Sequence, residues 1–280
     1  MNPRVRRVAV STVLLPFRLL PRPWQIRLAN AIHNGATGDN NGDFETNGEL
    51  YVMARAAARL SGRQSVVFDV GANVGDWTVE ALRRFSNFTT LYAFEPFPKT
   101  YRRLKENIAR AGGEKVVAVS AGLGDAEKTL KIFSSGSDEE ASKTNSLYRR
   151  EGVGGTFHAQ DDVQIRTGDQ FCKDSNIAEV DFIKLDVEGH EMAALRGFMG
   201  MLSRKQIGCV QFEYGGTWVD ARSFLIDMFQ LVRPLGYAVA KVHPRGIELL
   251  GEYRQSLDNF AYANFLLLRE DWVGAFDQIR

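Results

Sequence analysis

Acidic and glycine residues gather where one short apolar run of the sequence ends. The run 65–70 reads as a buried strand, and a helical pattern begins a few residues after it. Glycines at such a turn allow the backbone to approach a ligand closely at a helix N-terminus. The polar and glycine residues at this point are Asp69, Gly71, Asn73 and Gly75. Their pattern predicts a ligand site at the carboxyl end of this strand.

A further acid stands at the end of the next predicted strand. Glu95 closes the run 90–95 and lies twenty residues after Gly75. At this spacing an acid accepts hydrogen bonds from the hydroxyls of a ribose. Because ligands of parallel α/β sheets bind at the carboxyl ends of the strands, the two motifs are expected to meet. Together they indicate a nucleoside-containing cofactor.

The identity of the cofactor follows from departures from the dinucleotide fingerprint. A GxGxxG motif starting at Gly71 needs glycines where Asn73 and Asp76 stand. Asp69 and Asp76 would also bring negative charge towards a pyrophosphate, whereas S-adenosylmethionine has no phosphate and carries an ammonium and a sulfonium. The residues therefore favour S-adenosylmethionine. A nicotinamide-dependent oxidoreductase, a catalytically idle nucleoside-binding module and a glycine turn without any ligand stay as alternatives.

A second polar group is predicted at the next principal strand end. Asp186 ends the run 181–186, and His190 follows where a helix begins. Transfer of a methyl group to an alcohol is an in-line displacement that benefits from a base. His190 is the candidate base, and Asp186 is the candidate group that orients it or the acceptor. The alternative is that His190 is a surface residue at a helix start.

Glu213 closes the following strand, 208–213. If the two strands are neighbours, Asp186 and Glu213 project close to each other. Two carboxylates there could bind a divalent cation through oxygen. A hydrogen bond from the substrate to Glu213 is the preferred interpretation, and the sequence leaves any metal ligand unknown.

Three segments resemble the FkbM-type S-adenosylmethionine-dependent methyltransferases, with agreement in order and spacing over roughly residues 65–270. They are Val67–Gly75, Phe94–Pro96 and Asp181–Glu191. The resemblance implies the class I methyltransferase fold and O-methylation of a small-molecule, glycan-linked or lipid-linked acceptor. It also implies that Asp69, Gly71, Asn73 and Gly75 hold the methionine moiety, that Glu95 binds the ribose, and that Ser120 and Asp125 lie by the adenine.

The alternation of strand and helix patterns predicts an α/β fold with a doubly wound, mainly parallel, Rossmann-like sheet, and the family resemblance implies that this sheet has seven strands. The long segment 134–160, rich in serine, glycine and charge, interrupts this alternation and is a candidate substrate lid. The expected strands are 65–70, 90–95, 116–120, 129–133, 163–166, 181–186, 208–213, 237–242 and 261–268, and the expected helices are 49–60, 76–85, 99–110, 191–202 and 223–232.

The N-terminal part of the chain differs from the rest in charge. Residues 1–38 contain six arginines, and the first acid is Asp39. We predict a basic, partly helical arm and linker over residues 1–48 and a methyltransferase domain over 49–280. The arm suits contact with an anionic membrane, docking on the domain, or a mitochondrial transit peptide. A secretory signal is disfavoured, because no small-residue cleavage site follows the apolar run.

Overall composition argues for an ordinary globular enzyme. The net charge of +1 does not suggest a nucleic-acid partner. Cys172 and Cys209 lack CxxC spacing and read as reduced thiols, which fits a cytoplasmic protein, with peripheral contact at the inner membrane face as an option. Nothing in the sequence predicts an oligomeric state.

Overall fold

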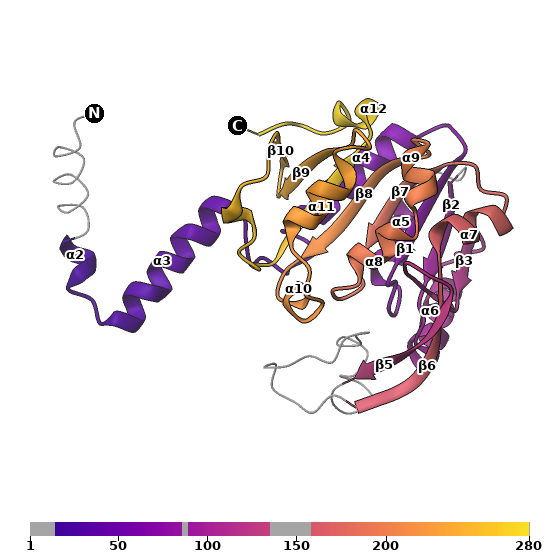
Figure 1. Ribbon diagram of the computed structural model, residues 1–280, viewed down its shortest axis with the longest axis horizontal. Helices are drawn as coiled ribbons and strands as arrows, with labels where there is room; N and C mark the ends of the chain where they lie inside the picture. Colours follow the sequence, from indigo (N-terminus) through magenta and orange to yellow (C-terminus); the bar gives the residue numbers. More distant parts are fainter. Residues whose placement is uncertain (1–14, 86–88, 135–157, 280) are drawn as a thin grey trace. The chain divides into compact units, whose positions relative to one another are not determined.

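The computed structural model describes residues 15–85, 89–134 and 158–279 (Figure 1). The chain divides into two compact units, one up to Asn41 and one from Gly42 onwards. The predicted lid falls almost entirely on residues 135–157, outside the described part, and so do the first fourteen residues of the predicted arm.

The first unit consists of helices, as the sequence predicted. After the short helix α2 (Leu15–Arg18), helix α3 (Arg22–Thr37) begins with a proline in its first turn, where the missing N–H has no helical partner to lose. It ends at Gly38, whose φ of 71° lets its N–H donate to the carbonyl oxygen of Asn34 at 2.8 Å. The helix therefore extends beyond Asn34, where the sequence pattern had suggested a loop.

The second unit is built on one mixed sheet of eight strands in the order β10-β9-β11-β8-β7-β1-β2-β3. The pairs from β3 to β8 are parallel, and β9, β10 and β11 make antiparallel pairs. The bounds are β1 (Ser65–Val70), β2 (Thr89–Phe94), β3 (Val116–Val119), β7 (Val180–Leu185), β8 (Ile207–Tyr214), β9 (Ala238–His243), β10 (Gly246–Leu250) and β11 (Ala263–Leu268).

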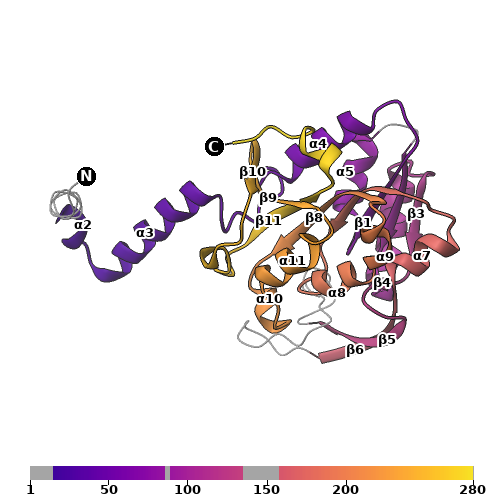
Figure 2. The same ribbon diagram turned by 45° about the horizontal axis from the view of Figure 1, so that its top comes forward.

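This arrangement confirms the class I methyltransferase architecture and corrects the strand count. The family resemblance implied seven strands, but β10 returns from β9 through a short turn and adds an eighth strand at the edge. The predicted runs 129–133 and 163–166 lie outside the main sheet. They belong to a three-stranded sheet of β4 (Gly122–Leu123), β5 (Lys128–Ser134) and β6 (His158–Arg166), in which β5 and β6 run side by side (Figure 2).

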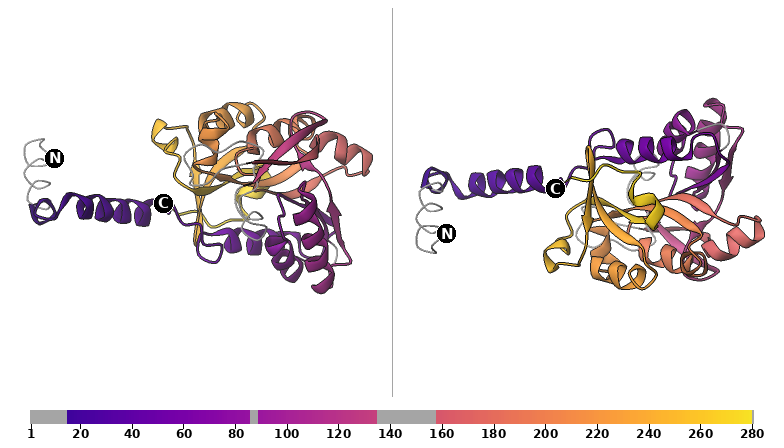
Figure 3. Two further views of the ribbon diagram at one scale, coloured as in Figure 1. Left: turned by 90° about the horizontal axis from the view of Figure 1, so that it is seen from below. Right: turned by 90° about the horizontal axis from the view of Figure 1, so that it is seen from above.

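Helices cover both faces of the main sheet (Figure 3). Successive side chains of a strand point to opposite faces, so Phe68 packs in one apolar cluster and Val67 in the other. The first cluster lies under α7 (Gly168–Asp174), α8 (Glu191–Arg196), α9 (Met199–Ser203), α10 (Thr217–Asp220) and α11 (Leu225–Val232). The opposite face carries α4 (Glu49–Leu60), α5 (Asp76–Arg84), α6 (Pro98–Arg110) and α12 (Glu270–Val273).

The expected helix 191–202 is two helices in the structure. It breaks at Gly197 between α8 and α9, where a Cβ atom would lie 2.1 Å from the carbonyl oxygen of Gly124. The close approach of the Gly124 backbone, which no periodicity reveals, therefore requires a glycine. Helix α7 was also missed, although Thr167 accepts a hydrogen bond from the N–H of Gln170 as its N-cap.

Candidate functional site

A cavity of about 670 Å³ opens at the carboxyl ends of β1, β2, β7 and β8, where ligands of such sheets bind. Its wall also includes Gly42, Phe44 and Glu49 from the segment around the start of α4. Of the predicted site residues, those that line the cavity are Asp69, Gly71, Asn73, Glu95, Asp186 and Glu213. The structure thus gathers both predicted strand-end motifs into one site.

The glycine turn after β1 is fixed by its surroundings. Gly71 has a φ of 86°, and a Cβ atom built there would lie 1.8 Å from the carbonyl oxygen of Asp186. The N–H groups of Gly71 and Ala72 both donate to the carbonyl oxygen of Phe94, at 3.0 and 2.9 Å. The turn is therefore held against both neighbouring strands, and any residue other than glycine at position 71 would displace the backbone that lines the cavity.

Asp69 is a fully buried acid at the end of β1. Thr78 donates a hydrogen bond to its Oδ2 at 2.5 Å, while Oδ1 has no hydrogen-bond partner among the described residues. Burial, opposed by the cation of Lys184, raises the pKa of Asp69 to about 6. A buried acceptor without a donor is costly to keep, so this oxygen suits a ligand that brings a cation or a donor.

Glu95 holds the turn as well as facing the cavity. Its Oε2 accepts from the backbone N–H of Asn73 at 3.0 Å, and its Oε1 accepts from that of Phe97 at 2.8 Å. Burial raises the pKa of Glu95 to about 7 against these two hydrogen bonds. The carboxylate therefore links the ends of β1 and β2, a structural task that the sequence did not indicate, and ribose binding stays a prediction for it.

A buried lysine, Lys184, lies among carboxylates on the cavity wall. Lys184 Nζ lies 2.8 Å from Asp186 Oδ2 and 3.8 Å from Glu49 Oε2. Burial by itself lowers the pKa of Lys184, but Asp186, Glu49, Asp69 and Glu213 outweigh it and raise the pKa well above its usual value. Lys184 is therefore a permanent cation among carboxylates.

Glu213 and Tyr262 complete this wall. Tyr262 donates its phenolic hydrogen to Glu213 Oε1 at 2.8 Å, and the N–H of the Trp218 indole donates to the Glu213 carbonyl oxygen at 2.9 Å. Burial and the charge of Asp186 raise the pKa of Glu213 well above its usual value. Since β7 and β8 pair in parallel, the expectation that Asp186 and Glu213 belong to neighbouring strand ends is confirmed.

Four predicted site residues are not part of the cavity wall. Gly75 precedes α5 with a φ of 95°, and Ser120 lies on a separate cavity beside β6. Asp125 is exposed and accepts from Lys128 Nζ at 2.7 Å, which holds its pKa below the usual range. Gly75 thus belongs to the turn before α5, and Ser120 and Asp125 lie before and after β4, outside the cavity wall.

The structure corrects the environment predicted for His190. The residue is 4% exposed, so it is not on the surface, yet it does not line the cavity either. Its Nε2 would lie 3.0 Å from a Cβ atom at Gly124, which shows that the ring packs against that glycine. Burial lowers the pKa of His190 to about 4. The ring is neutral at pH 7 and lies outside the cavity wall.

Sequence reasoning missed Glu49, Lys184 and Tyr262. Lys184 had a usable signal, because residues two apart on a strand share a face, so Lys184 and Asp186 point the same way. No signal in the sequence pointed to Glu49, because it reaches the site from a helix far away in sequence. Its Oε1 accepts from Asn47 Nδ2 at 2.7 Å, which fixes the carboxylate towards the cavity.

A divalent cation finds no ready ligand set in residues 15–85, 89–134 and 158–279, where no group of three or more His, Cys, Asp or Glu side chains could hold a metal ion. Beside Asp186, the ammonium of Lys184 supplies positive charge at 2.8 Å. The pair of Asp186 and Glu213 therefore reads as part of an ion-paired wall.

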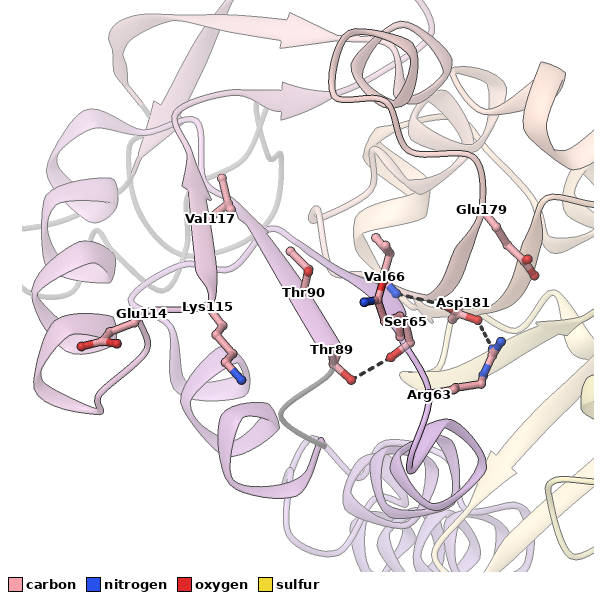
Figure 4. A pocket seen from close by; sticks show the side chains of 11 residues that line it. Arg63, Ser65, Val66, Thr89, Thr90, Glu114, Lys115, Val117, Glu179 and Asp181 are labelled. Atoms are coloured by element: carbon pink, nitrogen blue, oxygen red, sulfur yellow. Dashed lines mark hydrogen bonds and ion pairs between the residues drawn. The ribbon is translucent and has the colours of Figure 1, made fainter.

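A second cavity, of about 640 Å³, lies at the other end of the same strands (Figure 4). Five of its residues bond to one another. Arg63 pairs with Asp181 Oδ1, the N–H of Val66 donates to Asp181 Oδ2 at 2.9 Å, and the hydroxyls of Ser65 and Thr89 are 2.7 Å apart. Both oxygens of Asp181 therefore have donors within the protein.

Comparison with known proteins identifies a match to the methyltransferase FkbM domain over residues 69–239. The hexuronic acid methyltransferase AglP of Haloferax volcanii is 26% identical over 165 residues, which are 58% of this chain and 62% of that protein. The 31-O-demethyl-FK506 methyltransferase FkbM of Streptomyces tacrolimicus is 26% identical over 208 residues, 67% of this chain and 74% of that protein. The chain thus spans about three fifths of the length of the haloarchaeal relative.

Among solved structures, a methyltransferase from Aquifex aeolicus described as SAM dependent covers 82% of this chain and 95% of its own, with 11% identity and a TM-score of 0.42.

Proposed function

Since the chain belongs to the FkbM family of S-adenosylmethionine-dependent methyltransferases, we propose that it methylates a hydroxyl group of an uncharged, polyhydroxylated acceptor such as a sugar, glycolipid or natural product. Membership of this family replaces the nicotinamide-dependent alternative. The two relatives are named for a hexuronic acid and for an O-demethylated natural product, which supports an oxygen acceptor.

The observation that carries the proposal is the acidic, ion-paired wall of Glu49, Lys184, Asp186 and Glu213. Its single cation already has carboxylate partners at 2.8 and 3.8 Å. An acceptor with its own carboxylate would meet like charge on this wall, whose single cation is already paired. Arg103, the other cation that lines the cavity, comes from α6 and is not part of this wall. Carboxylates accept hydrogen bonds from hydroxyls, so the wall fits a neutral polyol.

The residues of the glycine turn fit the cofactor. The unpartnered Oδ1 of buried Asp69 suits an ammonium, and the missing side chain at Gly71 leaves the backbone open to close approach. When bound, the cofactor supplies an electrophilic methyl group on a positively charged sulfur. We assign Asp69, Gly71 and Asn73 to the methionine moiety and Glu95 to the ribose.

On the acceptor side, we assign Glu213 as the group that takes the hydroxyl proton. Its raised pKa makes it a stronger base than an ordinary carboxylate, and Tyr262 holds one of its oxygens at 2.8 Å. Asp186, fixed by Lys184, would orient the acceptor hydroxyl. His190 is not assigned to the base role, because it does not line the cavity.

The test uses cofactor labelled in the methyl group, incubated with the protein and matched pairs of neutral sugars and their uronic acids. We expect label in the neutral member, as a base-stable ether. Glu213→Gln should lower turnover by about 10² to 10⁴-fold, with unchanged affinity for S-adenosylhomocysteine. Label only in uronic acids would contradict the proposed acceptor class, and label in nitrogen or sulfur would contradict O-methylation. Cofactor binding without transfer to any acceptor would support the idle binding module.

The cytoplasm stays the predicted location. Cys172 and Cys209 are buried free thiols, and burial raises the pKa of Cys172 to about 12, which keeps it unreactive.

A further inference from the structure

Helix α3 presents an apolar face that no described residue of its own unit covers. None of its sixteen residues is buried, although Trp24, Leu28 and Ile32 are large and apolar. At 100° per residue these three side chains fall within about 80° of one another, and Ala31 lies in the same sector. Such a stripe normally packs against another surface, and the described part of the first unit supplies none.

The charges beside this face are all positive. Arg22 and Arg27 flank the apolar sector on its two sides, and the guanidinium of Arg27 lies 5.6 Å from the centre of the Trp24 ring. Arg18 precedes the helix in α2. The sequence has no acid before Asp39, so no intramolecular carboxylate of this segment neutralises these arginines. Tryptophan and arginine side by side are typical of a helix at a lipid–water interface.

We propose that α3 lies flat on an anionic lipid bilayer, with Trp24, Leu28 and Ile32 inserted below the headgroups and the arginines paired with lipid phosphates. Within the described residues no helix is long and apolar enough to cross a membrane, so contact of α3 with a bilayer is peripheral. The proposal concerns the first unit alone and does not depend on the acceptor.

Two other partners fit the charges and the apolar face less well. A second copy of the helix would bring arginines against arginines, since the segment has no acids to pair with them. A nucleic acid would neutralise the arginines but would leave Leu28 and Ile32 exposed to water. An anionic bilayer satisfies both the charge and the apolar face.

Vesicle flotation of the full chain tests the proposal with a matched pair of variants. Ile32→Asp places a charge on the apolar face, whereas Ile26→Asp makes the same chemical change about 170° from the centre of that face. The two side chains are 64% and 52% exposed, so neither change disturbs a core. We expect Ile32→Asp to lower the affinity for vesicles containing phosphatidylglycerol at least about tenfold more than Ile26→Asp does. Equal losses in the two variants would overturn the proposal, and binding of S-adenosylhomocysteine by both shows that they are folded.

Lipid charge and tryptophan fluorescence supply two independent measurements. Neutral phosphatidylcholine vesicles should bind much more weakly, and Arg22→Gln with Arg27→Gln should cost about fivefold for each cation removed. Trp77, Trp218 and Trp272 are buried, so a blue shift on binding reports Trp24 and should disappear in Trp24→Phe. Equal binding to neutral vesicles, self-association through α3 without vesicle binding, or a preference for RNA would each contradict the proposal.

Discussion

The two ends of the main sheet carry cavities of similar size, about 670 and 640 Å³, but they treat a buried acid in opposite ways. At the amino ends of the strands, both oxygens of Asp181 have donors. At the carboxyl ends, Asp69 is fully buried and keeps one oxygen without a partner in the described structure. The size of a cavity therefore does not distinguish the two ends, whereas the satisfaction of their polar groups does.

The backbone φ angles also differ between the two ends of the main sheet. At the carboxyl ends, the turns around the cavity hold Gly71, Asn73 and Glu188 at positive φ, a conformation that costs free energy in residues other than glycine. No residue that lines the amino-end cavity has a positive φ. At the turns around this cavity, positive φ angles and the unpartnered oxygen of Asp69 thus occur together, where the family's cofactor is expected to bind.

The largest expected effect comes from adding one methyl group at each end. Gly71→Ala forces a Cβ atom against the carbonyl of Asp186 at a φ of 86° and should lower the free energy of unfolding by about 3 kcal/mol or more. Gly62→Ala, before β1 at a φ of 78° with nothing within 4 Å, should cost only about 1 to 2 kcal/mol. Chemical denaturation measures both. Equal losses of unfolding free energy in the two variants would mean that the close approach at Gly71 does not affect stability.

The second comparison removes one charge from each buried acid. Asp69→Asn should weaken binding of S-adenosylhomocysteine by about 1.5 to 3 kcal/mol without lowering the stability of the ligand-free protein. Asp181→Asn should do the reverse, lowering stability by about 1 kcal/mol, because its partner Arg63 is half-exposed, and leaving binding unchanged. Titration calorimetry and denaturation of both variants decide the matter. Weaker binding of S-adenosylhomocysteine by Asp181→Asn would contradict the different roles given to the two acids.

The third prediction concerns pH. Because burial raises the pKa of Asp69 to about 6 and that of Glu95 to about 7, the ligand-free protein is stabilised below these values and loses that stability as pH rises through them. The positive charges of S-adenosylmethionine favour the ionised form of both acids. The affinity of the protein for S-adenosylmethionine should therefore rise about tenfold from pH 5 to pH 8. Asp69→Asn should flatten this dependence. A pH-independent affinity in the wild type would contradict the role of these acids.

The smallest effects are expected at two positions implied by family resemblance alone. Ser120→Ala and Asp125→Asn should each change cofactor affinity by less than about 0.5 kcal/mol, because neither side chain lines the cavity. A loss of tenfold or more in either variant, measured by calorimetry, would restore the predicted adenine contacts.

How far the sequence predicts this molecule depends on the range of the interaction. The strand ends at Asp69 and Glu95 could be located because periodicity and turn glycines are local signals. Glu49 could not be placed, since it reaches Lys184 from a helix that precedes the sheet. The burial of His190 could not be predicted, because the backbone of Gly124, distant in sequence, leaves space for its ring. The strand β10 was missed because its pairing with β9 is a property of the sheet edge.

Hydrogen exchange of the backbone amides with and without S-adenosylhomocysteine tests the central claim, that the ligand end of the sheet is the one with unsatisfied acids. We predict slower exchange in the ligand-bound protein at the turn after Asp69 and at the turn after Glu95. Exchange at the amino ends, around Val66 and Val117, should stay unchanged. Protection at the amino ends, or equal exchange with and without ligand at the glycine turn, would contradict the account.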